Sequence, residues 1–596
     1  MMKIHARKRI IPALWRIALY LTLLTLPAVP APALAKTFLN IAILKEPKNL
    51  NPFQPGDAWT KRVIQLIYQP LYLVDPDSQT LIPWLAQDQP VYDPESRTVT
   101  FHLREMRWDD GEEFTAEDVV FTGELFKKLR IPRYHAYWEP VEKMVAADKR
   151  TIRMTIRKPT AIFARRTLTS WVIQKKQWEP LVRRAEALLS GSGDSNPSEA
   201  IEERQREAAL KMIQSHMVSD PVGLGPFKIA SRKKGAYILL EKNDHFFGQG
   251  KNIAGRVLGP YIDGVLFKIY GTLSGATLAL KKGEVDFLWK GISHAFVKEL
   301  VQNPHISVPM TLDEGYRYLG FNLRKPPMSD PDFRRAVAYL INKDFIVKRI
   351  LHDHGQRLDT FIPPSNTFYY NPDTPAYGKG MDRKRRTQEA YAILTARGYQ
   401  WEVPPLNAEG SLQKGKGLTM PDGKAMGRLT LITPPAHYDT EMAASGQAIQ
   451  EWLGEFGIPV SWDSTAFANL IRQVKVDQDF DMFILSWRGL SLDPDYLRRF
   501  FHSAYNLPNQ WNFSGYHTDR FDRLAEMQMQ ALDLKERRRM VMRLQNLLSR
   551  DLPAIPLYVP HQMEGVRTDR FTGWVKEVGG VGNIWTFCML RPVQQN

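Results

Sequence analysis

Apolar and polar residues alternate along the chain with two different periods, and neither forms a fixed repeat. The run Leu39-Asn-Ile-Ala-Ile-Leu44 is typical of a buried strand. Between Val91 and Leu103, apolar residues alternate with polar ones around an Asp-Pro turn, which predicts a hairpin. Amphipathic helical spacing occurs at residues 60–68, 116–129, 332–351 and 439–456. Because strands and helices follow one another throughout, the pattern predicts an α/β protein.

Local signals mark several element ends. Thr115-Ala-Glu-Asp118 has the form of a variant capping box at the start of the helix expected over 116–129. Residues 278–282 are expected to end a helix, with Gly283 just beyond it and a strand at 284–288. The Gly- and Ser-rich segment 189–196 precedes Pro197, which opens a helical stretch to about Met217. We expect this stretch to belong to an inserted helical hairpin at about 175–220.

The first 35 residues have the pattern of a secretory signal peptide. Five Lys and Arg residues precede an apolar run at 17–26, and a small-x-small site ends at Ala35. An uncleaved membrane anchor is the alternative, but Pro27, Pro30 and Pro32 interrupt the second half as a helix. No cysteine stands at the expected cleavage point, which excludes a lipoprotein anchor. We therefore expect a soluble, periplasmic protein.

Composition narrows the function classes. At ~150 residues per domain, a length of 596 residues predicts three to four domains. Cys588 is the only cysteine, so no intramolecular disulfide can form. Removal of the predicted signal peptide would take away five positive charges and lower the net charge from +16 to +11. Export, and the lack of any DNA- or RNA-binding signature, remove nucleic acid as the expected partner. The basic runs 382–386 and 535–539 are expected on solvated helix faces.

No catalytic motif of a common hydrolase, metalloprotease or nucleotide-binding enzyme is present. Cys588 has apolar neighbours and is expected in a buried strand. His352 and His354 stand at the end of a predicted helix, where the helix dipole favours histidine. Their presence therefore does not require a metal site. Asp493 and Asp495 offer paired carboxylates, but no partner base is evident. We expect no catalytic residues, no cofactor and no metal.

An ordered set of segments resembles the dipeptide, oligopeptide and nickel-binding solute-binding proteins of ABC importers, known as family 5. The set covers nearly the whole mature chain, and its order is more specific than any single piece. Its members are Trp84-Leu-Ala86, Phe101-His-Leu-Arg104, Trp108-Asp-Asp-Gly111, Phe114 to Val119, Gly223-x-Gly-Pro-Phe227, Ala279 to Asp286, Gly320-Phe-Asn322, Pro326-Pro327, Asp330 to Ala336, Ala392-x-Leu394, Gly398-Tyr399, Gly457-Ile-Pro-Val460, Phe480-Asp-Met482, Trp487, Asp493-Pro494 and Pro553 to Tyr558.

The resemblance implies a type II periplasmic-binding-protein fold, with two lobes and an additional third domain. Domain I would be discontinuous, built from 36–73, 171–315 and 562–596, and would carry the helical insertion. Domain II would span 74–170, and domain III 316–561. In this family the lobes close around the ligand, and the permease in the membrane recognises the closed form.

The resemblance also implies ligand-binding residues. Trp487 matches the tryptophan of the family's cleft, although a core tryptophan is the competing interpretation. The dipeptide and oligopeptide binders place an aspartate soon after it for the ligand's amino terminus, but this sequence has Leu490 there. Arg488 could favour an anionic ligand instead, or point outwards. The remaining predicted ligand-binding residues are Asn322, Tyr318 and Tyr558.

These observations predict a non-enzymatic, monomeric binding protein that delivers a peptide or peptide-like solute to the permease of an ABC importer. The missing aspartate leaves the ligand class open between free peptides, longer or blocked peptides, opine-like compounds and oligosaccharides. A metal chelate is the least favoured ligand. A secreted hydrolase and a periplasmic scaffold that no longer binds ligand remain as alternatives of other classes.

Overall fold

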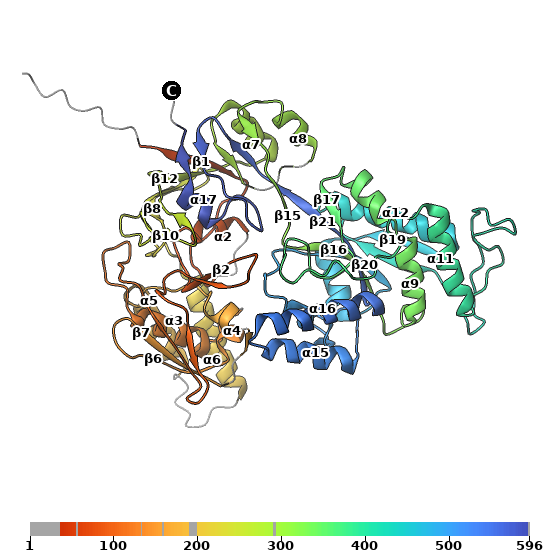
Figure 1. The fold of residues 1–596 in the computed structure, drawn as a ribbon, viewed down its shortest axis with the longest axis horizontal. Helices are drawn as coiled ribbons and strands as arrows, with labels where there is room; N and C mark the ends of the chain where they lie inside the picture. The colour runs from red at the N-terminus through yellow and green to blue at the C-terminus, as the bar shows by residue number, and fades with distance from the viewer. Residues whose placement is uncertain are drawn as a thin grey trace, which may run out of the picture. The chain divides into compact units, whose positions relative to one another are not determined.

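Three larger sheets organise the part of the chain that the structure describes. The computed structural model describes residues 36–54, 58–132, 134–157, 160–161, 163–189, 199–289, 292 and 294–593. Residues Phe38–Asn596 form one unit, and the predicted signal peptide lies outside the described residues. The α/β prediction is confirmed, because helices alternate with strands along this unit (Figure 1).

The first sheet collects strands from distant parts of the sequence. β1 (Phe38–Ile43) is the strand predicted at 39–44, and its next strands in the sheet, β12 and β13, both run parallel to it. The described strands lie in the order β14 (Ile306–Ser307), β22 (Gly565–Arg567), β13 (Phe287–Leu288), β1, β12 (Gly264–Ile269), β9 (Tyr237–Lys242) and β8 (Phe227–Lys233). Four helices lie in the same part of the structure as this sheet: α2 (Ala58–Ile64), α7 (Leu273–Lys282), α8 (His294–Leu300) and α17 (Ile584–Met589).

The second sheet lies within residues 91–156 and contains the predicted hairpin. Its described strands lie in the order β4 (Val91–Asp93), β5 (Thr98–His102), β7 (Thr151–Ile156) and β6 (Val141–Ala146). Near it in sequence are β2 (Tyr72–Val74), β3 (Leu81–Pro83), α3 (Ala116–Lys128), α4 (His135–Trp138) and the π-helical turn η1 (Phe163–Thr167). The helical hairpin α5 (Lys175–Leu189) and α6 (Glu199–Ser215) follows, as the pattern predicted.

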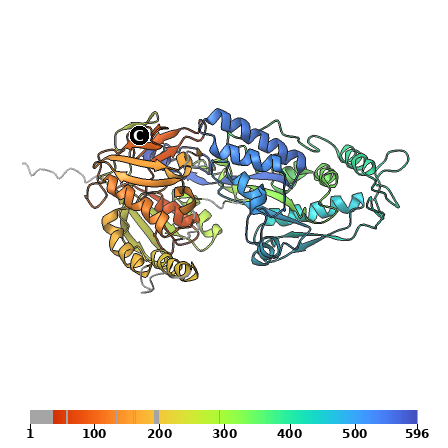
Figure 2. The ribbon, with the colours of Figure 1, turned by 90° about the horizontal axis from the view of Figure 1, so that it is seen from below.

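The third sheet lies within residues 310–563. Its described strands lie in the order β15 (Met310–Leu312), β21 (Ala554–Met563), β16 (Tyr316–Phe321), β20 (Met482–Trp487), β18 (Leu429–Thr433) and β19 (Val460–Ser464), and β17 (Gly355–Arg357) also pairs with β21. The main helices of this region are α9 (Pro331–Leu340), α11 (Arg383–Ala396), α12 (Thr440–Phe456), α14 (Tyr496–Phe501), α15 (Asp519–Gln530) and α16 (Leu534–Asp551). α15 and α16 lie side by side in both views (Figures 1 and 2).

The chain passes between the first and third sheets at two places. One passage is Val308-Pro309, between β14 and β15, and the other is Glu564, between β21 and β22. The two passages contact each other, because the backbone N–H of Glu564 donates to the carbonyl of Pro309 at 3.2 Å. β15 pairs with β21 in the third sheet, although its residues fall within the range predicted for domain I. The predicted domain boundaries themselves remain a prediction.

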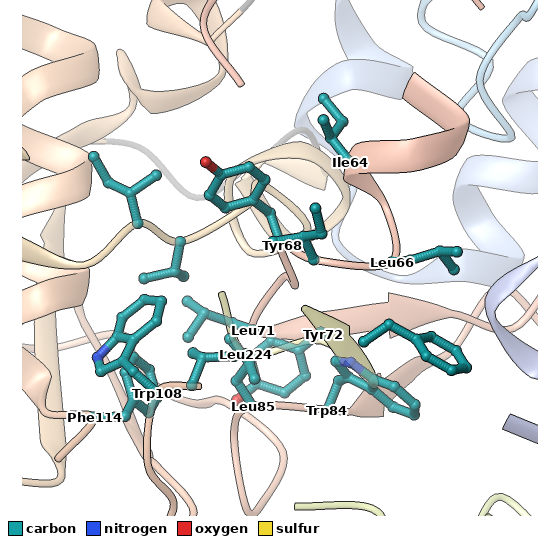
Figure 3. Packing of buried hydrophobic residues seen from close by; sticks show 14 of the residues in the cluster. Ile64, Leu66, Tyr68, Leu71, Tyr72, Trp84, Leu85, Trp108, Phe114 and Leu224 are labelled. Carbon is teal, nitrogen blue, oxygen red and sulfur yellow. The ribbon is translucent and has the colours of Figure 1, made fainter. Parts of the chain in front are cut away.

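A large aromatic and aliphatic core lies beneath α2 and the segment that follows it (Figure 3). Trp108 and Phe114 meet edge to face, with ring centroids 5.6 Å apart. The fully buried Trp84 donates from Nε1 to the side chain of Gln69 at 2.8 Å. Burying side chains of this size stabilises the fold by roughly 1.5–3 kcal/mol each, which fixes the segment that carries α2.

Three predictions from pattern alone were wrong in detail. The single helix expected over 332–351 stops at Leu340, because Asn342 caps a new short helix by accepting from the amide of Phe345. Cys588 is buried as expected, but it lies in the helix α17, capped by Asn583, and not in a strand. The basic runs 382–386 and 535–539 are not solvated throughout, because Arg386 is buried and Arg537 is fully buried.

None of the helices in the described ranges combines the length and the apolar composition that a membrane crossing requires.

Candidate functional site

One cavity of the described structure has a volume of about 490 Å³, and we call it the ligand pocket. Its walls come from α2, α4 and η1, and from the loop after β20 together with α14. Its apolar lining consists of Trp487, Leu490, Leu492, Phe500, Trp511 and Val578, and its remaining lining residues are Lys61, Tyr137, Arg166, Glu314, Gly489, Ser491, Tyr496 and Arg499.

A second cavity of about 220 Å³ adjoins the ligand pocket. Both are lined by Lys61, Tyr137 and Arg166, so the two volumes meet at these side chains. The second cavity adds the polar side chains of Gln65 and Ser170, among others, and an aromatic wall at Trp171. The two cavities together can therefore hold a longer ligand than the ligand pocket could hold alone.

Trp487 is held by rings on several sides. Its ring stacks on Phe500, with centroids 3.8 Å apart and planes 10° apart. Tyr318 is nearly parallel to it at 6.1 Å, and Phe513 lies at 5.6 Å. Because β20 ends at Trp487 and the neighbouring rings fix its orientation, the half-buried indole forms a preorganised wall of the pocket.

The loop after Trp487 is anchored by a buried ion pair. The guanidinium of Arg537 donates to both carboxylate oxygens of Asp493 at 2.7 and 3.0 Å. Burial opposes ionisation of Asp493, but the charge and hydrogen bonds of Arg537 outweigh it and lower the pKa of Asp493 to about 2. Asp495 is paired with Arg498 at 2.9 and 3.1 Å. Both carboxylates are therefore paired with arginines that stabilise the loop.

The predicted site residues divide into three groups. Trp487 and Leu490 line the ligand pocket. Tyr318 lies behind Trp487, where burial raises the pKa of its hydroxyl. Arg488, Asn322 and Tyr558 are not among the lining residues.

Each of these last three side chains has other contacts. Arg488 donates to Asp439 at 3.0 Å, so its charge is already matched by a carboxylate. The amide of Asn322 donates to the carbonyls of Gln478 and Phe480, and it thereby holds the start of the segment leading to β20. Tyr558 is fully buried in the core of the third sheet.

Sequence reasoning missed the polar side of the pocket. Lys61, Tyr137 and Arg166 lie more than 300 residues before Trp487 in the sequence, and no motif marks them. The sequence indicates Arg499 only weakly: this residue stands three positions after Tyr496 and therefore near the same face of α14.

Comparison with known proteins identifies the family. The sequence model described as "Bacterial extracellular solute-binding proteins, family 5 Middle" matches residues 80–508. The "Peptide transport periplasmic protein SapA" of Salmonella typhimurium is 22% identical over 545 residues, covering 87% of each chain. The "Oligopeptide-binding protein AppA" of Bacillus subtilis is 25% identical over 462 residues, covering 76% of this chain and 74% of AppA.

The fold agrees with that family. The structure of a periplasmic oligopeptide-binding protein of an oligopeptide ABC transporter from Thermotoga maritima superposes with a TM-score of 0.73. That likeness covers 94% of this chain and 99% of the other, at 22% identity. The predicted type II periplasmic-binding-protein fold is confirmed, and the chain belongs to the bacterial extracellular solute-binding proteins of family 5.

Proposed function

We propose that this protein is the periplasmic binding component of an ABC importer, and that it carries a peptide or peptide-like solute in the ligand pocket. The observation that carries the proposal is the make-up of that pocket. An ordered aromatic wall faces side chains that can hydrogen-bond, within about 490 Å³. This volume lies within the range of ~300–1,000 Å³ that is usual for sites of small ligands.

The position of the pocket supports a capture mechanism. Lys61 and Arg166 come before the passage at Val308-Pro309, whereas Trp487 and Leu490 lie between the two passages. A ligand that contacts both groups stabilises the arrangement in which they face each other. The membrane subunits would then recognise the loaded form, and no chemical step on the solute is needed.

The relatives support the solute class and the compartment. SapA is named a peptide transport periplasmic protein, and AppA an oligopeptide-binding protein. In the proposed function, the expected partners are the permease subunits of an importer in the inner membrane, and the protein acts as a monomer.

Native mass spectrometry of the purified full chain tests the proposal directly. We expect a small molecule that leaves on denaturation, and calorimetry of the emptied protein should detect binding of peptides from a mixed library. No bound solute, together with no heat and no thermal shift from any peptide, would overturn the proposal.

Replacing the aromatic wall tests the site. Trp487→Ala should weaken binding tenfold or more, which corresponds to about 1.4 kcal/mol. Trp487→Phe keeps a ring on Phe500 and should retain most of the affinity. Trp401→Ala is the matched control, because Trp401 is also half-buried and packs against Phe456, away from the pocket. Unchanged affinity in Trp487→Ala would remove Trp487 from the site.

A further inference from the structure

The ligand pocket has an excess of positive charge. Lys61, Arg166 and Arg499 line it and come from three separate elements, α2, η1 and α14. Lys61 and Arg166 also line the adjoining cavity. Three cations therefore surround one connected volume.

Two of these cations have no acidic partner within the described chain. Among the residues that the structure describes, no carboxylate lies within ion-pairing distance of Arg166 or Arg499. The Arg166 guanidinium lies 5.2 Å from the ring centroid of Tyr137, which fixes its position without neutralising its charge. The carboxylate of Asp493 is bound by Arg537, so it is not available to Arg166.

In the described part of the chain, Glu314 is the one carboxylate that lines the two cavities. It packs against Gly579, where an added Cβ would lie 2.2 Å from its Oε1. Burial lowers the pKa of the Arg62 guanidinium. The negative charges of Glu564 and Glu314 act in the opposite direction and raise this pKa. With one carboxylate against three cations in its lining, the ligand pocket keeps an excess of positive charge.

The apolar wall sets where an anion can bind. Trp487 and Leu490 line the pocket and carry no charge. The resemblance to the family's peptide binders sets Leu490 where those proteins place an aspartate for the ligand's amine. A positively charged ligand would meet three like charges here, whereas a carboxylate would meet a guanidinium that can bind it through two hydrogen bonds.

We propose that the pocket selects an acidic solute: a short peptide-like molecule with at least two carboxylates, bound by Arg166, Arg499 and Lys61, with its apolar part on Trp487. This inference rests on the proposed function and names its substrate class. Arg488, which sequence reasoning suggested for this role, is replaced by residues that line the pocket.

Calorimetry with three tetrapeptides of equal length tests the proposal on the full mature chain. The peptides alternate alanine with glutamate, glutamine or lysine, and are measured at about 50 mM salt. We expect the glutamate peptide to bind at least tenfold more tightly than the glutamine peptide, and the lysine peptide to bind most weakly. The preference should shrink as salt rises, because the charges are partly exposed.

Substitutions in the pocket test which side chains cause the preference for the glutamate peptide. Arg166→Gln and Arg499→Gln should each reduce the glutamate-over-glutamine ratio at least threefold. Arg166→Lys keeps the charge and should retain part of the ratio, which separates lost charge from lost folding. Arg539→Gln, on the exposed face of α16, removes the same charge away from the pocket and should leave the ratio intact.

The outcomes separate the two proposals. Equal affinities for the glutamate and glutamine peptides, or tighter binding of the lysine peptide, overturn the acidic-solute inference and leave peptide capture standing. A preference for glutamate that survives both Arg166→Gln and Arg499→Gln overturns the assignment to these residues. No binding of any peptide, and no solute in the native mass spectrum, overturns the proposed function itself.

Discussion

At the scale of single residues, the buried pair Asp493–Arg537 shows how a charge can serve the pocket without entering it. Arg537 has no exposed surface, and it also donates to the side chain of Gln528 at 3.1 Å. The pair holds the start of the segment that leads into α14, which carries Tyr496 and Arg499. Because both charges are shielded from water, removing one partner leaves the other without compensation.

We expect Arg537→Met to lower the free energy of unfolding by about 3–5 kcal/mol, since Asp493 would remain buried without its cation. Denaturant unfolding at neutral pH measures this. Arg543→Met is the control, because Arg543 lies on the exposed face of the same helix and should change stability by no more than about 0.5 kcal/mol. Equal losses in the two variants would contradict the role of the pair.

Because of the same pair, we expect the free energy of unfolding to depend on pH in the acidic range. The pKa of Asp493 is about 2 in the folded protein, below its ordinary value of 3.8. Its contribution to stability is therefore fully present above about pH 4 and is lost as the pH falls towards 2. The difference in unfolding free energy between the wild type and Asp493→Asn should shrink over this interval. A difference that stays constant from pH 5 to pH 2 would show that Asp493 is not held ionised.

Leu490 gives a gain-of-function prediction. Leu490→Asp would place a carboxylate in the ligand pocket, at the position where the resemblance to peptide binders implies an aspartate for the ligand's amine. The quantity compared is the affinity for a free-amine peptide divided by the affinity for the N-acetylated form of the same peptide. This ratio should be several-fold higher in the variant than in the wild type. Competition between the two forms of one peptide measures the ratio. An unchanged ratio would mean that position 490 does not meet the ligand's amino terminus.

At the scale of elements, the start of α3 depends on one buried carboxylate. Asp118 accepts from the backbone N–H of Thr115 at 3.0 Å, as the capping pattern predicted. It also accepts from Trp108 Nε1 at 3.3 Å and from the backbone of Lys175, at the start of α5, at 2.8 Å. One side chain therefore joins the ends of two helices.

Asp118→Ala should lower the free energy of unfolding by about 2–3 kcal/mol, because it leaves several buried donors without an acceptor. Thermal unfolding followed by circular dichroism measures the loss. Glu124→Gln, at an exposed position later in α3, should cost no more than about 0.5 kcal/mol. A loss in Asp118→Ala as small as that of the control would contradict the joint role in α3 and α5.

Elements with strong local signals were predictable from the sequence. β1, the β4–β5 hairpin and α12 follow from the pattern of apolar and polar residues within their own segments. The break at Asn342 was missed, since the apolar spacing continues across it and only the side-chain cap interrupts the helix. The burial of Arg537 was not predictable, because its partner Asp493 lies 44 residues away in the sequence.

At the scale of the whole molecule, the pocket was only half predictable. Trp487 and Leu490 follow a recognisable strand, so the resemblance located them. Lys61 and Arg166 reach the same cavity through the fold of distant segments, and an isolated basic residue in a sequence looks like any solvated one. The family was therefore evident from the sequence, whereas the charge of the pocket required the structure.

Ligand capture should change the dimensions of the molecule, because the lining residues lie on both sides of the two passages at Val308-Pro309 and Glu564. We expect the radius of gyration from small-angle X-ray scattering to fall when a ligand saturates the protein. Trp487→Ala should need at least tenfold more ligand for the same change. An unchanged radius at a concentration that calorimetry shows to be saturating would exclude closure on binding.

The strand order of the first sheet imposes a delay during synthesis. β14 pairs with β22, yet about 260 residues separate them, so β14 is made long before its neighbour. At about 5–20 residues per second, the gap lasts roughly 13–50 s. Until β22 arrives, β13 presents an open edge to the surroundings, and open edges invite pairing with other chains. The first sheet therefore cannot be completed before residue 565 is available, and a chain truncated before that residue would keep the edge open permanently.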